Sequence, residues 1–266
     1  MTVGVGAPGR AQIPARTLRT DRWWRPPLVT GAVLAFFVVY ATARIFMNKW
    51  YWVGDYHYLT PVYSPCVSDS CDPGAVHFFT FLPKLPVFIP IALITFVILA
   101  GFRGTCYYYR KAGYRSFFMA PAACAVPEPH RKYTGESRFP LVLLNLHRYF
   151  FYGALIFGLI NVYDGVHAFQ GHDGGFGFGL GTVIIWINLV MLWFYTLSCH
   201  ACRHIVGGRL NSFSKHPWRY RYWTFVSKLN TRHMQLAWIT LGTLALTDFY
   251  VMCVAAGWFS DPRFIG

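Results

Sequence analysis

Eight cysteine and histidine side chains could together bind a metal at one face of a membrane. They are Cys106, Cys124, His147, Cys199, His200, Cys202, His204 and His233. Thiolates and imidazoles are the ligands of zinc sites and of mixed-ligand iron–sulfur clusters, and imidazoles also bind haem iron. Because ionisable side chains inside a membrane bundle are costly, a functional role is the first hypothesis for this group.

The spacing of four of these residues limits which of them can share a metal. In a continuous helix Cys199 and Cys202 lie on one face, and His200 and His204 lie on another. At about 100° per residue the two faces are roughly 150° apart. One straight helix therefore cannot direct all four side chains at one metal, unless the glycine pair that follows unwinds its end.

Three kinds of metal centre are compatible with these residues. Zinc binds two cysteines and two histidines, but such a site would be structural. Haem b needs two axial histidines, which His147 could supply with His233 or His200. A [2Fe–2S] cluster with mixed ligands uses both residue types, and histidine ligands raise its potential. The plain alternative is that the histidines form packing hydrogen bonds and the cysteines fill the core, as we expect for Cys253.

Aromatic and cationic side chains surround this group and suit a quinone pocket. The candidates are Tyr107, Tyr108, Arg110, Arg148, Arg203 and Trp238. A flat ring can pack on Trp or Tyr while Tyr or Arg donates hydrogen bonds to its carbonyls. Arg148 is the sharpest candidate because it lies inside an apolar stretch beside His147. Anchoring at the membrane interface is the ordinary alternative for the aromatic residues.

The elements that must position these residues are membrane-spanning helices. The chain has 266 residues, of which 55% are hydrophobic and 13% are charged, too few charges for an ordinary soluble domain. Its net charge of +14 does not indicate a nucleic-acid partner, because the basic residues lie between long apolar runs. Five apolar stretches are long enough to be candidate membrane spans, which need roughly 20 residues. They are residues 27–47, 85–102, 140–163, 179–206 and 231–258.

The basic residues predict the orientation of an all-α integral membrane bundle. They concentrate in residues 1–26 and in the connections 103–139 and 207–230. Cytoplasmic segments carry the excess of Lys and Arg, so we expect a cytoplasmic N-terminus and an anchor domain over residues 27–258. The connection 48–83 and the tail 259–266 then lie outside. Within that outer connection, Cys66 and Cys71 form either a short disulfide or two free thiols.

Asp248 lies within the last span and Asp164 ends the third. We expect Asp248 to accept hydrogen bonds from the backbone or Thr247. Proton movement is the alternative role, and a small transporter lined by both aspartates and Arg148 is an alternative function. A transporter favours internal repeats, and the sequence has no convincing one.

Four blocks of sequence resemble the membrane-anchor subunit of actinobacterial succinate dehydrogenases. They are TCYYYRKAGYRSFFMAPAACAV, FPLVLLNLHRYFFY, YTLSCHACRHIVGGRL and RHMQLAW. The resemblance runs from the second span to the last. It implies a five-helix anchor in a bacterial cell membrane, with FAD-bearing and iron–sulfur subunits docked on the cytoplasmic face. It also implies that electrons reach a quinone, menaquinone or ubiquinone, in this chain, which has no succinate site.

The resemblance bears on the cofactor as well. Dihaem anchors of this family carry histidines on four helices, whereas the first two predicted spans here contain none. We therefore expect a Rieske-type [2Fe–2S] cluster near the cytoplasmic side, with haem b as the alternative. The preferred ligands are Cys106, Cys199, His147 and His233, followed by Cys124, Cys202, His200 and His204. A purely structural anchor is a further alternative, and the oligomeric state of the complex is left open.

Overall fold

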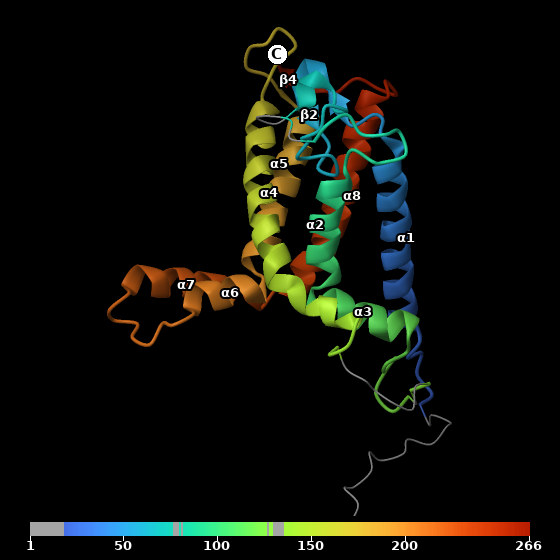
Figure 1. The fold of residues 1–266 in the computed structure, drawn as a ribbon, viewed down its shortest axis with the longest axis vertical. Coiled ribbons are helices and arrows are strands. Elements are labelled where there is room, and N and C mark those ends of the chain that lie inside the picture. The colour runs from blue at the N-terminus through green and yellow to red at the C-terminus, as the bar shows by residue number, and fades with distance from the viewer. Residues whose placement is uncertain (1–18, 77–79, 81, 127, 130–135) are drawn as a thin grey trace, which may run out of the picture.

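The computed structural model describes residues 19–76, 80, 82–126, 128, 129 and 136–266, and these residues are mainly helical. Five helices run along the long axis of the molecule (Figure 1). They are α1 (Arg25–Met47), α2 (Leu93–Gly104), α4 (His147–His167), α5 (Leu180–Leu197) and α8 (His233–Ala255). The expected all-α class is thereby confirmed.

Shorter elements close the two ends of the bundle. At one end α3 (Tyr107–Phe117), α6 (His200–Gly207) and α7 (Pro217–Asn230) lie across the long axis (Figure 1). At the other end β1 (Trp52–Val53) pairs with β2 (Tyr58–Leu59), and β3 (Phe178–Gly179) pairs with β4 (Arg263–Ile265), both antiparallel. Three short 3₁₀ helices are η1 (Gly54–Tyr56), η2 (Pro73–Ala75) and η3 (Leu141–Leu146). We call these the inner and outer ends, following the predicted orientation.

Four helical segments are long and apolar enough to cross a membrane. They are α1, Leu141–His167, α5 and α8. Large apolar side chains point away from the protein along them, as Val39 (69% exposed) and Leu159 (63%) illustrate. Side chains of this kind are stable in lipid, so the bundle is a multi-pass membrane domain. Its orientation and the number of crossings stay predictions.

The second predicted span is shorter than the sequence suggested. Instead of residues 85–102, α2 begins at Leu93 and has 12 residues, about 18 Å at 1.5 Å per residue. Pro86 and Pro90 explain the difference, because a proline lacks the N–H that a helix interior needs. Both prolines start hydrogen-bonded turns, closed by the amides of Ile89 and Leu93.

The fourth predicted span is also not one helix. α5 ends at Leu197, and Cys199 takes an extended conformation as the N-cap of α6. The hydroxyl of Ser198 donates to the carbonyl of Tyr195 at 2.7 Å, a local bond that competes with helix continuation. The chain leaves the bundle axis here, and α6 and α7 extend sideways (Figure 1).

The outer end is held by a disulfide and by buried tyrosines. Cys66 and Cys71 are bonded, which decides between the two alternatives that the sequence left open. The hydroxyl of Tyr63 donates to the carbonyl of Arg44 at 2.6 Å and accepts from the amide of Asn48 at 2.9 Å. Burial raises the pKa of Tyr63 to about 12, so this hydroxyl keeps its proton well above neutral pH.

A buried ion pair joins α1 to α8 near the outer end. Nε of Arg44 lies 2.7 Å from Oδ2 of Asp248, and the two side chains are 2% and 0% exposed. The hydroxyl of Tyr40 donates to the same carboxylate at 2.6 Å. The expectation that backbone or Thr247 would satisfy Asp248 was therefore wrong, because the first helix passes close enough to supply a cation. This pair fixes α1 against α8 at the outer end.

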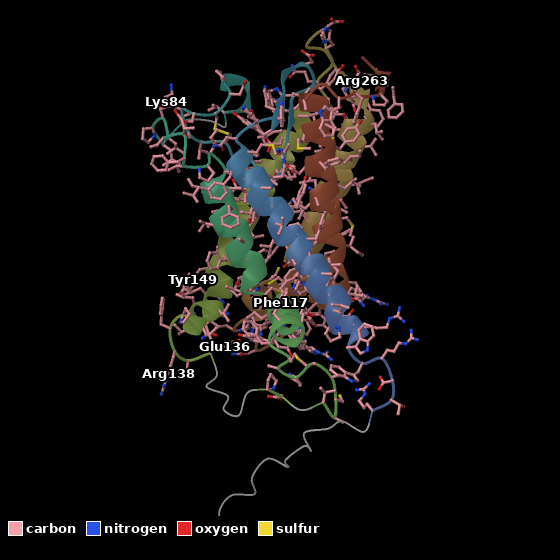
Figure 2. The ribbon with its side chains drawn as sticks, turned by 90° about the vertical axis from the view of Figure 1, so that its right-hand side faces the viewer. Lys84, Phe117, Glu136, Arg138, Tyr149 and Arg263 are labelled. Carbon is pink, nitrogen blue, oxygen red and sulfur yellow. A yellow bond between two sulfur atoms is a disulfide. The ribbon has the colours of Figure 1, made fainter. Side chains whose placement is uncertain are left out.

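Arg44→Met should destabilise the protein by about 3–5 kcal/mol, because it leaves the Asp248 carboxylate buried without a cation. Thermal unfolding of the purified protein in detergent measures the change. Arg44→Met combined with Asp248→Leu should recover most of the loss, and Lys84→Met, which removes an exposed cation at the same end, should cause almost none (Figure 2). If Arg44→Met and Lys84→Met had the same midpoint of thermal unfolding, the ion pair would not be stabilising.

Candidate functional site

Four of the predicted ligands lie together at the inner end of the bundle. Cys106 follows α2 as the N-cap of α3, His147 begins α4, Cys199 stands between α5 and α6, and His233 begins α8. Each stands where one helix ends or begins, so the chain brings four element termini to one level. Cys106, Cys199 and His233 are 2%, 0% and 3% exposed.

The four side chains form two cysteine–histidine pairs. Nε2 of His147 lies 3.1 Å from Sγ of Cys199. Nε2 of His233 lies 3.6 Å from Sγ of Cys106. The pairs join segments 52 and 127 residues apart in the sequence. We call these four residues the Cys/His group.

Two hydroxyl groups fix the orientation of both imidazoles. Nδ1 of His147 lies 2.9 Å from Oγ1 of Thr105, and Nδ1 of His233 lies 2.7 Å from Oγ of Ser198. Each hydroxyl already donates its only proton to a carbonyl, Thr105 to Gly101 at 2.6 Å and Ser198 to Tyr195 at 2.7 Å. Both hydroxyls must therefore accept from an Nδ1–H.

This tautomer leaves a lone pair on Nε2 of each histidine, directed at a thiol. A histidine that binds a metal typically donates its other N–H to a neighbouring group, which sets the ring orientation. The arrangement of His147 and His233 has that form. Thr105 and Ser198 were not among the residues predicted for this site. In the sequence, each directly precedes a cysteine of the group, and this is the one sign that could have indicated them.

Aromatic rings enclose the two imidazoles. The Phe102 ring stacks on His147 with centroids 5.1 Å apart, and the Tyr195 ring stacks on His233 at 5.0 Å. Phe102 and Tyr195 are themselves 5.5 Å apart and almost fully buried. This packing holds the rings in place and buries Cys106, Cys199 and His233, whereas His147 stays partly exposed.

The other four predicted ligands lie elsewhere. His200 and His204 are exposed on α6 and contact each other through Nε2 atoms 3.1 Å apart. Cys202 is buried, and Cys124 is exposed in the connection after α3. The cysteines and histidines of α6 thus face different ways, as their spacing predicted. Within the part of the chain that the structure describes, no three His, Cys, Asp or Glu side chains are arranged closely enough to hold a metal ion.

The predicted quinone residues are spread over the inner end. Tyr107 and Arg148 are exposed. Arg110 forms an ion pair with Glu136, and Arg203 lies over the Trp223 ring at 5.4 Å while its Nε donates to Ser227. Tyr108 and Trp238 line one cavity of about 190 Å³ between α1, α3 and α8. The Tyr108 ring lies 5.6 Å from that of His233.

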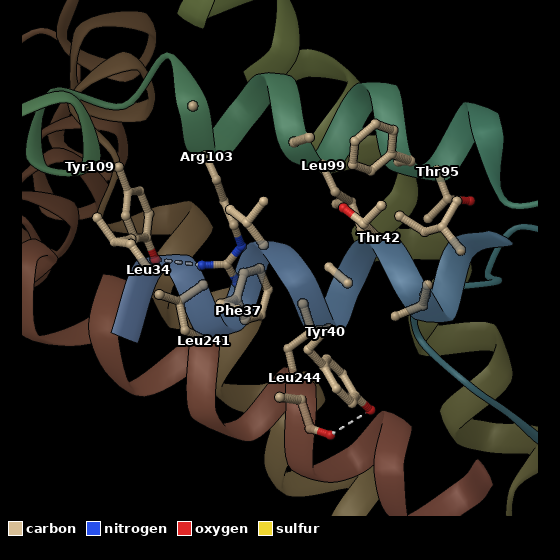
Figure 3. Close-up of a pocket in the computed structure, with 18 residues that line it drawn as sticks. Leu34, Phe37, Tyr40, Thr42, Thr95, Leu99, Arg103, Tyr109, Leu241 and Leu244 are labelled. Carbon is tan, nitrogen blue, oxygen red and sulfur yellow. Dashed lines mark hydrogen bonds between the residues drawn. The ribbon is translucent and has the colours of Figure 1, made fainter. Parts of the chain in front are cut away.

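A larger cavity of about 280 Å³ lies between α1, α2 and α8 (Figure 3). Its walls are mainly apolar, with Arg103 and Tyr109 at the inner end and Tyr40, Thr42 and Thr95 nearer the outer end. Arg103 is 9% exposed, and the hydrogen-bond acceptors that it has among the described residues are neutral. They are the Tyr109 hydroxyl at 2.6 Å and the hydroxyl and carbonyl of Thr240 at 3.3 and 3.4 Å.

Arg103 also connects this cavity with the Cys/His group. Its guanidinium lies 4.9 Å from the centroid of the Tyr195 ring, the same ring that stacks on His233. No carboxylate among the described residues forms an ion pair with it. From the sequence, Arg103 was predicted only to be one of the cytoplasmic basic residues, because an arginine at the end of an apolar stretch usually marks the inner membrane boundary.

Comparison with known proteins gives one family and one structure. Residues 25–257 match the family model of the actinobacterial succinate dehydrogenase subunit SdhC. The whole chain is similar to a chain of the Mycobacterium smegmatis Sdh1 complex in the apo form, with 64% identity, a TM-score of 0.90 and full coverage of both chains. No curated protein matches the chain.

The exposure of Cys124 tests the predicted orientation. We expect a membrane-impermeant maleimide to label the protein in inside-out vesicles and not in right-side-out vesicles, because Cys124 is the exposed free thiol of the inner end. Mass spectrometry of the labelled peptide identifies the site. Cys124→Ser should abolish the label. Labelling only in right-side-out vesicles would reverse the orientation.

Proposed function

Because this chain belongs to the actinobacterial family of the succinate dehydrogenase subunit SdhC, we propose that it transfers electrons from a docked iron–sulfur subunit to a quinone in the bacterial cell membrane. A FAD-bearing partner oxidises succinate to fumarate, which releases two electrons and two protons. The quinone takes up two electrons and two protons and becomes a quinol. This chain supplies the membrane anchor, a redox relay and the quinone site.

The two cysteine–histidine pairs of the Cys/His group support this proposal. Two thiols and two imidazoles match the mixed ligand set of a Rieske-type [2Fe–2S] cluster. Both histidines present an Nε2 lone pair toward the group, and Thr105 and Ser198 hold the opposite N–H. Cys106, Cys199, His147 and His233 would hold the cluster, and both thiols would lose their protons on binding it. When bound, the cluster would accept and release one electron at a time.

Haem b is the second candidate for the same position. Axial ligation would require Nε2 of His147 and Nε2 of His233 to face each other across an iron. Each Nε2 instead faces a thiol, at 3.1 and 3.6 Å. The mixed ligand set also gives a role to both cysteines, which haem leaves unused.

The soluble subunits would dock at the inner end, over α3 and α6. The Cys/His group lies directly behind the starts of these two helices. Electrons that arrive from a docked iron–sulfur subunit therefore meet the group before they meet the apolar middle of the bundle.

Arg103 offers the best position for the quinone ring. A buried cation without a carboxylate is costly, so a ligand that brings a partial negative charge would be bound there. A quinone carbonyl can accept from the guanidinium at the inner end of the 280 Å³ cavity, and the isoprenoid chain can follow its apolar walls between α1 and α2. The pocket of Tyr108 and Trp238 is the competing position.

Low-temperature EPR of the purified complex tests the cluster. We expect a Rieske-like signal of low average g after reduction, together with a negative pyridine haemochrome assay. Cys106→Ser, Cys199→Ser, His147→Ala and His233→Ala should each abolish the signal, and Cys253→Ser, which alters a buried thiol near the outer end, should keep it. A haem spectrum that disappears in His147→Ala would replace the cluster by haem b.

Steady-state kinetics test the quinone position. Arg103→Gln should raise the KM for quinone about tenfold or more, because a charged hydrogen bond to the carbonyl is lost. Ala41→Phe should raise it as well by filling the cavity, whereas Val39→Phe, which points away from the protein, should not. Succinate oxidation with a soluble dye should be equal in all variants. A raised KM in Trp238→Ala alone would place the quinone in the competing pocket.

A further inference from the structure

We infer that α7 is an interfacial arm that binds the anionic phospholipids of the inner leaflet. α7 extends sideways from the inner end of the bundle, where the spans end (Figure 1). It is therefore at the height of the lipid headgroups and oriented along the membrane surface. Neither the Cys/His group nor the quinone cavity uses any residue of this helix.

α7 packs against α6 through several hydrogen bonds, and one side of α7 stays uncovered. The guanidinium of Arg219 donates to the carbonyls of Val206 and Gly208. Arg203 bonds to Ser227 and lies over Trp223. Asn230 donates to the carbonyl of Ser198 at 2.8 Å, which ties the arm to the bundle. These contacts occupy the side of α7 that faces α6.

Another side of α7 carries an aromatic stripe, which consists of Trp218, Tyr222 and Phe225. At the edge of this stripe the Tyr222 hydroxyl donates a hydrogen bond to Cys202 of α6. The three residues follow the i, i+4, i+7 spacing of one helix face, and they are 78%, 43% and 44% exposed. Trp and Tyr concentrate at membrane interfaces because their rings combine an apolar body with a polar group. An aromatic face of this kind is unfavourable in water but suits the boundary between headgroups and acyl chains.

The charge of the arm identifies the lipid. Residues 200–232 contain seven Lys and Arg, and no acidic residue occurs between Asp173 and Asp248. Arg221 and Lys228 are exposed on α7, beside the aromatic stripe and away from the side that contacts α6. A cationic edge along an apolar stripe is the pattern of helices that lie on anionic membranes. A protein partner would find here no acidic residue with which to pair its own cations.

Spin labelling can distinguish whether the uncovered side of α7 faces lipid, water or another protein. The complex is placed in nanodiscs with 30% phosphatidylglycerol, and a nitroxide is attached to Phe225→Cys in a Cys124→Ser background. We expect collisions with oxygen to exceed those with a water-soluble nickel chelate, because the label lies in the apolar boundary. A label on Lys215→Cys, outside the aromatic stripe, should favour the nickel chelate. Low accessibility to both reagents would indicate a protein partner, such as a docked subunit or a second copy, and would overturn the inference, as would high nickel accessibility at position 225.

A charge variant tests the preference for anionic lipid. Titration of short-chain phosphatidylglycerol into the detergent-solubilised complex should raise its unfolding temperature, and phosphatidylcholine should not. Arg221→Gln with Lys228→Gln should weaken the apparent affinity about fivefold for each cation removed. Lys84→Gln, an exposed cation at the outer end, should leave it unchanged (Figure 2). Equal affinity in the double variant would refute the role of these two cations.

Discussion

The break between α5 and α6 is the feature on which most of the structure depends. At Ser198 and Cys199 the backbone stops making helical bonds, and the freed groups are used elsewhere. The Ser198 hydroxyl fixes His233, the Cys199 thiol meets His147, and the Ser198 carbonyl holds Asn230 of α7. A continuous helix would lose all three contacts and would send α6 and α7 straight out of the bundle.

The first helix is fixed to the bundle near both of its ends. At the outer end the pair of Arg44 and Asp248 fixes α1 to α8. At the inner end Gly31 lies against Ser116, where a Cβ would be only 3.2 Å from the serine side chain, and α1 meets α3. Helices fixed at two separated points need not touch between them, and the larger cavity occupies this space.

The sequence predicted composition-driven features well and local geometry less well. The length of the apolar stretches located four spans. The similar membrane depth predicted for Cys106, His147, Cys199 and His233 indicated the group that the structure brings together. Pro86 and Pro90 shortened α2, a local effect that hydropathy averages away. The partner of Asp248 depended on how α1 crosses α8, and the neutral surroundings of Arg103 depended on the packing of α2, α3 and α8. Neither is encoded in the spacing of residues along one segment.

The order of the segments has a consequence for biogenesis. His147 and Cys199 are both present once the chain has been synthesised past α5, but Cys106 meets its partner only when His233 at the start of α8 follows, 127 residues after Cys106. A membrane helix is inserted as it leaves the ribosome, so the second pair is the last part of this centre to form. Any cofactor that needs all four side chains can therefore be inserted only after His233 has been synthesised, and a chain that stops before α8 contains only one of the two pairs.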